Sequence, residues 1–189
     1  DNREILKWDE LQRTFDLAKV NKSASIYDPH KLNWVNGEHF RAMDDEDFSR
    51  HALAYLKEQK LLKHDETLVH RISPVFKDNI ERFDQLSERL EILNESFAYE
   101  TPKLIENKAI FKAAISVLDN FVEAWRAVPL QFEDFINQLK PKVKVKGKEL
   151  FMPIRMALMG KEHGPELKRV FPVLGLELVK KRFEQALKS

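Results

Sequence analysis

The sequence predicts an all-α fold made of two consecutive helical domains, and three observations support this prediction. Apolar residues recur at helical spacing in several stretches. Acidic residues and prolines stand where helices would begin. No convincing run of alternating apolar and polar residues indicates a strand. We place the boundary near residue 99, so that residues 1–99 form a helical bundle and residues 100–189 a second helical module.

Each predicted helix has its own signal. Asp28-Pro29 offers an N-cap carboxylate followed by proline at the first helical position, where its missing N–H costs nothing. Residues 44–47 are all acidic and fit the first turn of the next helix, because negative charge meets the positive end of the helix dipole there. Apolar stripes predict three further helices, over residues 80–93, 110–125 and 176–187. Thr101-Pro102 and Val128-Pro129 are expected to interrupt the helical pattern.

The second module is punctuated differently from the first. Four of the 5 glycines lie there, at positions 147, 160, 164 and 175, and prolines occupy positions 141, 153, 165 and 172. This spacing favours short helices joined by tight turns over one long helix.

Charge is distributed unevenly along the chain. Residues 140–189 carry 13 Lys and Arg against 5 Asp and Glu, whereas the preceding residues carry 19 and 26. The formal net charge of +1 conceals this polarity. A concentrated basic segment suggests one surface that faces a polyanion, although a lysine-rich surface that faces only solvent is the plain alternative.

Several classes of chemistry are absent from the sequence. With 0 cysteines, the chain has no disulfide, Cys-ligated zinc, iron–sulfur cluster or thiol nucleophile. It contains no Gly-rich nucleotide-binding motif, and its 6 histidines show no metal-ligand spacing. We therefore expect no catalytic residue, metal site or cofactor in this chain. No apolar run approaches the roughly 18 residues of a membrane span, and we expect a cytoplasmic protein without a signal peptide.

Two long stretches carry a specific resemblance. Residues 15–37 read FDLAKVNKSASIYDPHKLNWVNG, and residues 146–160 read KGKELFMPIRMALMG, followed by Gly164-Pro165-Glu166-Leu167. The first resembles the segment just after the Lys-Met-Ser-Lys-type loop of bacterial glutamyl-tRNA synthetases, and the second resembles the C-terminal signature of that family. The two stretches occur in the family's order, so the resemblance covers almost the whole chain.

The resemblance implies that the chain is the tRNA-reading part of a glutamate–tRNA ligase. It implies a stem-contact helical domain followed by an all-helical anticodon-binding domain, without the catalytic domain that carries the His-x-Gly-His and Lys-Met-Ser-Lys signatures. The parent enzyme would use ATP with magnesium. The implied partner is tRNA(Glu), bound through its anticodon loop and inner stem, and we expect a monomer that binds neither DNA nor membranes.

The same resemblance implies roles for individual residues. Arg155 falls where the family places an arginine that contacts the first anticodon base, and the turn containing Gly164, Pro165 and Leu167 aligns with the loop that cradles this base. Arg82 falls where discriminating enzymes carry an arginine that selects cytosine at the third anticodon position. Met159 departs from the family, which usually has Thr there.

Physical chemistry supports these roles. An anticodon is a single-stranded loop whose bases can be read on their exposed edges, and the planar guanidinium of arginine suits this task. Four lysines alternate through a connection bounded by proline and glycine, and we expect them to contact phosphates: Lys142, Lys144, Lys146 and Lys148. Four residues flanking the helix from Pro29 could contact the inner stem: Lys22, Lys31, Asn36 and Arg41. Trp34 is expected in the core.

Alternatives remain open at the level of both the chain and the residue. The chain could be a helical module that binds a protein, with a basic end that serves only solubility. A non-discriminating enzyme that also charges glutamine tRNA is disfavoured by Arg82. This arginine could itself be an ordinary surface residue paired with Asp78 or Glu81.

Overall fold

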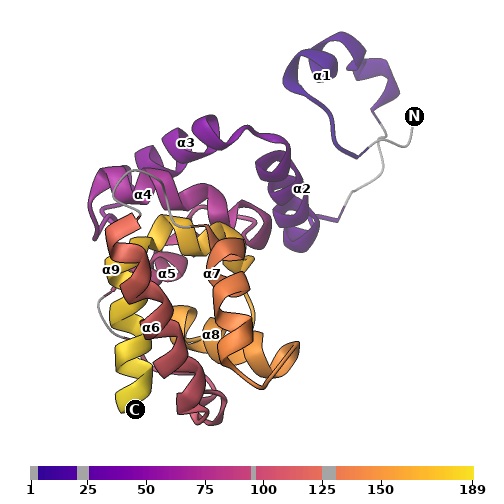
Figure 1. Ribbon diagram of the computed structural model, residues 1–189. Coiled ribbons are helices and arrows are strands. Elements are labelled where there is room, and N and C mark those ends of the chain that lie inside the picture. Colours follow the sequence, from indigo (N-terminus) through magenta and orange to yellow (C-terminus); the bar gives the residue numbers. More distant parts are fainter. Residues whose placement is uncertain (1–3, 21–25, 95–96, 125–130) are drawn as a thin grey trace.

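The fold is known from a computed structural model that describes residues 4–20, 26–94, 97–124 and 131–189. Within these ranges every regular element is a helix, which confirms the all-α class (Figure 1). The expected break at Val128-Pro129 and the end of the predicted stripe at Trp125 lie outside the described residues.

The first half of the chain, up to residue 99, contains two longer α-helices and several shorter helical elements. Its α-helices are α1 (Trp8–Thr14), α2 (Pro29–Ala42), α3 (Asp45–Glu58), α4 (Glu66–Ile72) and α5 (Asp84–Arg89). Its 3₁₀ turns are η1 (Leu17–Lys19), η2 (Ser73–Asn79) and η3 (Leu90–Leu93).

The second half contains the longest helices, and α6 and α9 lie side by side in it (Figure 1). Its α-helices are α6 (Lys108–Ala124), α7 (Phe132–Leu139), α8 (Lys148–Met159) and α9 (Leu167–Lys188). Its 3₁₀ turns are η4 (Pro102–Ile105) and η5 (Lys140–Lys142).

The predicted N-cap at Asp28 is confirmed, and Asp44, which the sequence places in the first turn of the next helix with residues 45–47, is the N-cap of that helix. The carboxylate of Asp28 accepts hydrogen bonds from the backbone amides of His30, at 2.9 Å, and Lys31, at 3.3 Å. The carboxylate of Asp44 accepts one from the amide of Asp47 at 2.8 Å, and this hydrogen bond lowers the pKa of Asp44. Both caps satisfy amides that have no partner inside the helix.

The prediction of one continuous helix over residues 80–93 is wrong. Only α5 is α-helical there, between the turns η2 and η3. The side chain of Gln85 accepts hydrogen bonds from the backbone amides of Glu81, at 2.8 Å, and Arg82, at 3.1 Å. These amides are thereby satisfied outside a helix, and Ile80 before them has an extended backbone.

Glycine and proline end helices of the second half at fewer positions than their spacing predicts. Pro153 lies inside α8 and Pro172 inside α9, and neither ends its helix. The break comes at Gly175, where φ of 75° and ψ of 164° separate two helical segments of α9. The stripe over residues 176–187 follows this break, as predicted.

A continuous apolar core runs from Phe40 in α2 to Ala186 in α9. In the second half it contains stacked aromatic rings: the ring centroid of Phe135 lies 4.9 Å from that of Phe171 and 5.8 Å from that of Phe183. Residues from both sides of position 99 contribute to this core, and the domain boundary there stays a prediction.

The expectation that Trp34 belongs to the core is wrong. Its side chain is 37% exposed, because α2 buries only Gly37 and Phe40 near its C-terminal end. The start of α2 therefore projects from the core (Figure 1). Helix α1 contributes no buried residue at all.

Candidate nucleic-acid interface

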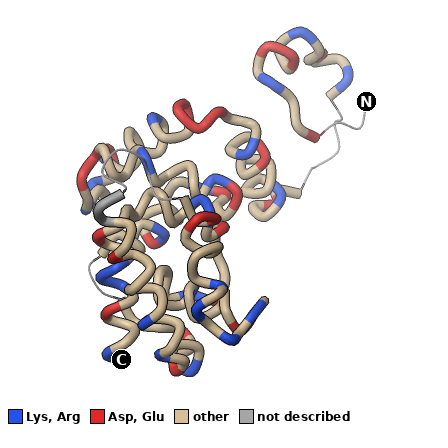
Figure 2. Tube along the Cα trace, in the orientation of Figure 1, with Lys and Arg blue, Asp and Glu red and all other residues tan. Residues whose placement is uncertain are grey.

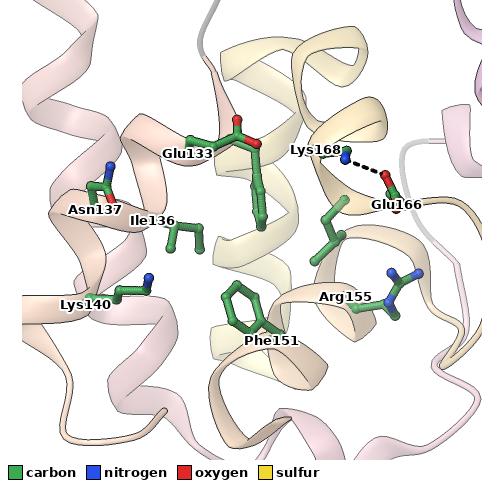
Figure 3. A pocket seen from close by; sticks show the side chains of 10 residues that line it. Glu133, Ile136, Asn137, Lys140, Phe151, Arg155, Glu166 and Lys168 are labelled. Atoms are coloured by element: carbon green, nitrogen blue, oxygen red, sulfur yellow. Dashed lines mark ion pairs between the residues drawn. The ribbon is translucent and has the colours of Figure 1, made fainter. Parts of the chain in front are cut away.

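A cavity of about 490 Å³ lies between α7, α8 and the start of α9, and we call it the α7–α9 cavity. Its apolar lining consists of Phe132, Ile136, Phe151 and Leu167. Its polar lining consists of Glu133, Asn137, Lys140, Arg155, Glu166 and Lys168. Figure 3 shows Ile136 and Lys140 on one side and Arg155 on the other, with Phe151 between them. The cavity thus combines an apolar wall with several hydrogen-bonding groups, a combination that suits a ligand with both an apolar face and polar edges.

Among the described residues, the charged side chain of Arg155 in α8 is contacted by neutral groups. Its Nη1 donates a hydrogen bond to the carbonyl oxygen of Pro165 at 3.0 Å and lies 3.6 Å from the sulfur of Met159. Within the part of the chain that the structure describes, it forms no ion pair with a carboxylate. Partial burial lowers the pKa of Arg155, since burial disfavours the charged form. The guanidinium is thus held by neutral acceptors and keeps donors for a ligand.

The loop from residue 160 to 166 connects α8 to α9 and needs glycine twice. At Gly160, φ is 72°, and an added Cβ would lie 2.6 Å from the ring of Phe97. At Gly164, φ is 144°, and an added Cβ would lie 2.9 Å from the terminal methyl of Met159. Both positions have a positive φ that favours glycine, and at Gly160 the approach to the ring of Phe97 and the backbone carbonyl of Ala98 leaves no room for a Cβ.

This loop brings the predicted base-contacting residues together. Pro165 is buried and orients Arg155 through its carbonyl, while Leu167 lines the α7–α9 cavity. Gly164 lines a second cavity on the same loop. Glu166 is paired with Lys168 at 2.9 Å, and this contact lowers the pKa of Glu166. Arg155, Gly164, Pro165 and Leu167 therefore lie within this loop or beside it.

The second cavity, of about 200 Å³, lies between this loop and the connector, which we define as residues 92–94 and 97–101. We call it the connector cavity. Its lining includes Arg89, whose Nε is buried and has no hydrogen-bond partner. Sequence reasoning missed Arg89, because nothing local separates it from other surface arginines. Its neighbour Glu88 is paired with Lys161 at 2.9 Å across the cavity mouth.

The lysines predicted to meet phosphates form an exposed ridge. Lys142, Lys144, Lys146 and Lys148 are all exposed, whereas the intervening Val143 and Val145 pack against the core. Figure 2 shows basic residues gathered in the turn between α7 and α8. Among the described residues, none of the four forms an ion pair, and the Nζ of Lys142 lies 3.4 Å from the hydroxyl of Ser116. Between η5 and α8, alternation along the chain explains this in part, because successive side chains of an extended segment point to opposite sides.

Arg82 is placed differently from the prediction, which set it on a helix beside an apolar stripe. It precedes α5 and is exposed. Its guanidinium binds the carboxylate of Asp84 through two hydrogen bonds, from Nε at 2.9 Å and from Nη2 at 2.7 Å. The pair lowers the pKa of Asp84. Arg82 lines neither cavity, and the partner is Asp84 where the open alternative named Asp78 or Glu81.

The residues predicted to contact the tRNA stem are engaged within the chain. Lys31 is paired with Glu4 at 2.6 Å, and Arg41 with Glu38 at 2.5 Å. The amide group of Asn36 donates a hydrogen bond to the carbonyl oxygen of Glu81. Lys22 lies outside the described residues.

Neither a metal-binding cluster nor a membrane-spanning helix occurs in the described ranges. No group of three or more His, Asp or Glu side chains among residues 4–20, 26–94, 97–124 and 131–189 is arranged to hold a metal ion. In the same ranges no helix is long and apolar enough to cross a membrane.

Comparison with protein families gives a match over most of the chain. The model of a family described as an anticodon binding domain matches residues 47–187. The match includes the 160–166 loop, both cavities and the lysine ridge.

Curated relatives are glutamate–tRNA ligases that are longer than this chain. The enzyme from Finegoldia magna is 28% identical over 99% of this chain and 39% of its own length. The enzyme from Natranaerobius thermophilus is 31% identical over 97% of this chain and 40% of its own length. The chain thus spans about two fifths of the relatives it matches.

Solved structures agree at the level of the fold. The crystal structure of glutamate–tRNA synthetase from Elizabethkingia anophelis superposes with a TM-score of 0.68 and 22% sequence identity. The superposition covers 100% of this chain and 37% of that one.

Proposed function

The chain belongs to the anticodon binding domain family, and on this basis we propose that it reads the anticodon of tRNA(Glu) as part of a glutamate–tRNA ligase. The observation that carries the proposal is the setting of Arg155. This guanidinium lines an apolar cavity, is oriented by neutral acceptors, and has no carboxylate partner among the described residues. An unpaired base could enter such a cavity and receive hydrogen bonds on its edge.

The α7–α9 cavity has the chemistry that a nucleobase needs. Phe132 and Phe151 offer aromatic faces for stacking, and Arg155 offers paired donors to oxygen and nitrogen acceptors. Leu167 supplies an apolar contact beside the base, whereas Pro165 lines the connector cavity and acts on the base only through Arg155. In this proposal Arg155 contacts the first anticodon base, as the family resemblance implies.

The remaining cations divide into two sets under the proposal. The lysine ridge contacts phosphates, which supplies register and salt-dependent affinity with little sequence information. Arg89 is an additional donor at the connector cavity. The selection of the third base by Arg82 stays a prediction, and the RNA would have to displace Asp84 to use this side chain.

The ligase reaction itself is assigned to the part of the relatives that this chain does not span. Under the proposal, glutamate is activated with ATP and magnesium there, and this chain contributes tRNA binding alone. The proposed stem contacts of Lys31, Asn36 and Arg41 require these side chains to exchange an intramolecular partner for RNA.

Binding of the chain to an RNA hairpin with the anticodon stem-loop of tRNA(Glu) tests the proposal. We expect the dissociation constant to rise steeply with salt, as it does when cations displace counterions from phosphates. Arg155→Met should weaken binding by about 1–3 kcal/mol, the size of a good bidentate base contact. The matched control is Arg50→Met, which removes an exposed arginine that is paired with Asp47 on α3.

The outcomes distinguish contact of Arg155 with the base from contact with the RNA backbone. Loss with Arg155→Met on the cognate hairpin, and little loss on a hairpin with a replaced first anticodon base, supports base reading. Equal loss on both hairpins would mean that Arg155 contacts only the RNA backbone. Salt-independent binding, or none, would contradict the proposal and favour a protein-binding module.

A further inference from the structure

The connector runs beside the end of α8 and the 160–166 loop. The backbone amide of Glu100 donates a hydrogen bond to the carbonyl of Gly160 at 2.7 Å. The carboxylate of Glu100 accepts one from the amide of Glu162 at 2.8 Å. The ring of Phe97 lies directly against Gly160, where an added Cβ would be 2.6 Å away. The position of the loop therefore depends on the position of the connector.

Arg182 in α9 joins these segments from within the core, and it is 0% exposed. Its Nη1 donates to the carbonyl of Leu158, in the last turn of α8, at 2.8 Å. Its Nη2 donates to the carbonyl of Asn94 in the connector at 2.7 Å, and also to that of Ile92. Its guanidinium carbon lies 4.0 Å from the ring centroid of Phe97. One side chain thus contacts three connector residues and the end of α8.

The positive charge of Arg182 is compensated by neutral groups. Among the described residues Arg182 forms no ion pair, and its Nε has no hydrogen-bond partner. Burial lowers the pKa of Arg182 to about 10, so the group stays protonated at neutral pH. Carbonyl dipoles and the face of Phe97 compensate the charge instead. Because burying a charge is costly, this arrangement contributes less to stability than apolar residues of the same size could.

One of the carbonyls that Arg182 binds lies beside the 160–166 loop, which carries residues proposed to contact the base. The carbonyl of Leu158 precedes Gly160 by two residues, and Met159 between them lies against Arg155. Phe97 is held between Arg182 on one face and Gly160 at its edge. A shift of the connector would therefore move the loop, and with it the Pro165 carbonyl that orients Arg155.

We propose that Arg182 is a positioning residue for anticodon reading: it fixes the connector to the end of α8 and thereby holds the 160–166 loop and Arg155 in the geometry that recognises the base. The proposal rests on the proposed function of the chain. It assigns to Arg182 no contact with RNA, because the side chain is fully buried.

The test measures discrimination, which is the ratio of the dissociation constants for two hairpins. One hairpin carries the anticodon stem-loop of tRNA(Glu), and the other has its first anticodon base replaced. Arg182→Met keeps an unbranched apolar stem and removes the guanidinium donors, and we expect it to lower discrimination roughly tenfold, within the range that a lost base contact gives. Salt dependence should stay unchanged, because the lysine ridge is untouched. Arg182→Lys should restore discrimination in part, since one ammonium can still reach a carbonyl.

A matched control exists on the same helix. Arg169 also ties α9 to the first half, through Asp78 at 2.7 Å and the carbonyl of Pro74 at 2.7 Å, but it does not contact the connector. Arg169→Met should therefore keep discrimination. Circular dichroism confirms that each variant is folded. If Arg182→Met does not fold, Phe97→Leu takes its place, because it removes the ring between Arg182 and Gly160 and should lower discrimination as well.

A double-mutant cycle identifies the route of the effect. If Arg182 acts by orienting Arg155, then Arg182→Met should change discrimination little when Arg155 is already Met. Unchanged discrimination in folded Arg182→Met or its Phe97→Leu substitute, or an equal loss in Arg169→Met, would overturn the proposal. A wild-type chain that does not discriminate between the hairpins would overturn the proposed function instead.

Discussion

Cations in the first half of the chain and those at residues 140–155 differ in their surroundings. In the first half, many are held by carboxylates at 4 Å or less, as in the pairs Lys31–Glu4, Arg41–Glu38, Arg50–Asp47, Lys57–Glu66, Lys77–Asp45 and Arg82–Asp84. Among the described residues of the second half, the four ridge lysines and Arg155 have no such partner. The ridge lysines and Arg155 can therefore meet a polyanion without first breaking an ion pair, as can lysines of the first half that have no ion pair among the described residues, such as Lys60 and Lys63, whereas the paired cations cannot.

The difference follows from composition as well as from geometry. The first 139 residues carry 26 acidic side chains, so a basic residue there finds a carboxylate nearby, whereas residues 140–189 carry 5. An exposed pair is worth little to stability, but it reduces the charge that an incoming phosphate meets. The availability of a cation, more than its identity, therefore separates the candidate interface from the rest of the surface.

The largest expected effect comes from neutralising the ridge. Replacing Lys142, Lys144, Lys146 and Lys148 by Gln should reduce the salt slope of hairpin binding by up to about 3, because each phosphate contact on single strands contributes about 0.7. Affinity at about 0.1 M salt should fall by up to roughly two orders of magnitude. Fluorescence anisotropy over a series of salt concentrations measures both.

Cations of the first half that are paired with carboxylates provide the control for that experiment. Replacing Arg13, Lys19, Arg50 and Lys57 by Gln removes the same number of charges from paired positions, and it should change the slope much less. An equal change from the two quadruple variants would mean that pairing in the free protein does not decide which cations bind RNA.

The next effect concerns the loop that presents Arg155. Gly160→Ala should lower the free energy of unfolding by about 2–4 kcal/mol, since it adds backbone strain at positive φ to a clash with Phe97. Gly37→Ala in the first half should change it by less than about 1 kcal/mol, because Ala favours the helix and the neighbours, Glu81 and Arg41, are flexible side chains. Urea unfolding measures both, and similar losses would contradict this account of the loop.

A smaller effect tests the pairing idea in the first half directly. Asp84→Asn should free Arg82 and raise hairpin affinity at low salt by about two- to fivefold, as one additional phosphate contact would. The double variant with Arg82→Gln should lose this gain. An unchanged affinity in Asp84→Asn would show that Arg82 is too far from the bound RNA to contribute, and its predicted role in base selection would then be wrong.

The smallest effect is on pH dependence. Asp44 caps α3, and its pKa is lowered by the hydrogen bond from the amide of Asp47, so its contribution to stability is present above the unfolded pKa of about 4. That contribution should disappear as the pH falls through the lower pKa of the folded state. The stability difference between wild type and Asp44→Ala should therefore be constant near neutrality and vanish in acid. A difference that persists at the lowest pH would show that the cap is not electrostatic in origin.

The parts of the molecule with a local signal were predictable from the sequence. Asp28 and Asp44 stand at predicted helix starts and cap them, because a carboxylate there can accept hydrogen bonds from first-turn amides that have no partner inside the helix. The loop was marked by Gly160 and Gly164, whose conformations no other residue adopts easily. The resemblance to a family then placed Arg155 beside that loop, where the structure has it.

The remaining features depend on contacts between distant residues. The helix predicted over residues 80–93 begins only at Asp84, and the amides of Glu81 and Arg82 before it are bound by the side chain of Gln85, a contact that no pattern marks. Arg182 belongs to the run Lys180-Lys181-Arg182 and resembles a surface residue in composition. Its only signal is its register, since it shares the helix face of Val179 and Phe183, which are buried. The pairing of Arg82 with Asp84 depends on a local turn that no pattern marks.

The most direct test of the central claim follows the arginine side chains themselves. In a chain labelled with ¹⁵N at arginine, the Nε–Hε signals are recorded while the anticodon hairpin of tRNA(Glu) is added. If Arg155 reads the anticodon, its signal shifts as the hairpin binds, while the signals of Arg13 and Arg50, which are paired with Asp9 and Asp47, stay in place. Shifts of Arg13 and Arg50 with Arg155 unmoved would contradict this role of Arg155.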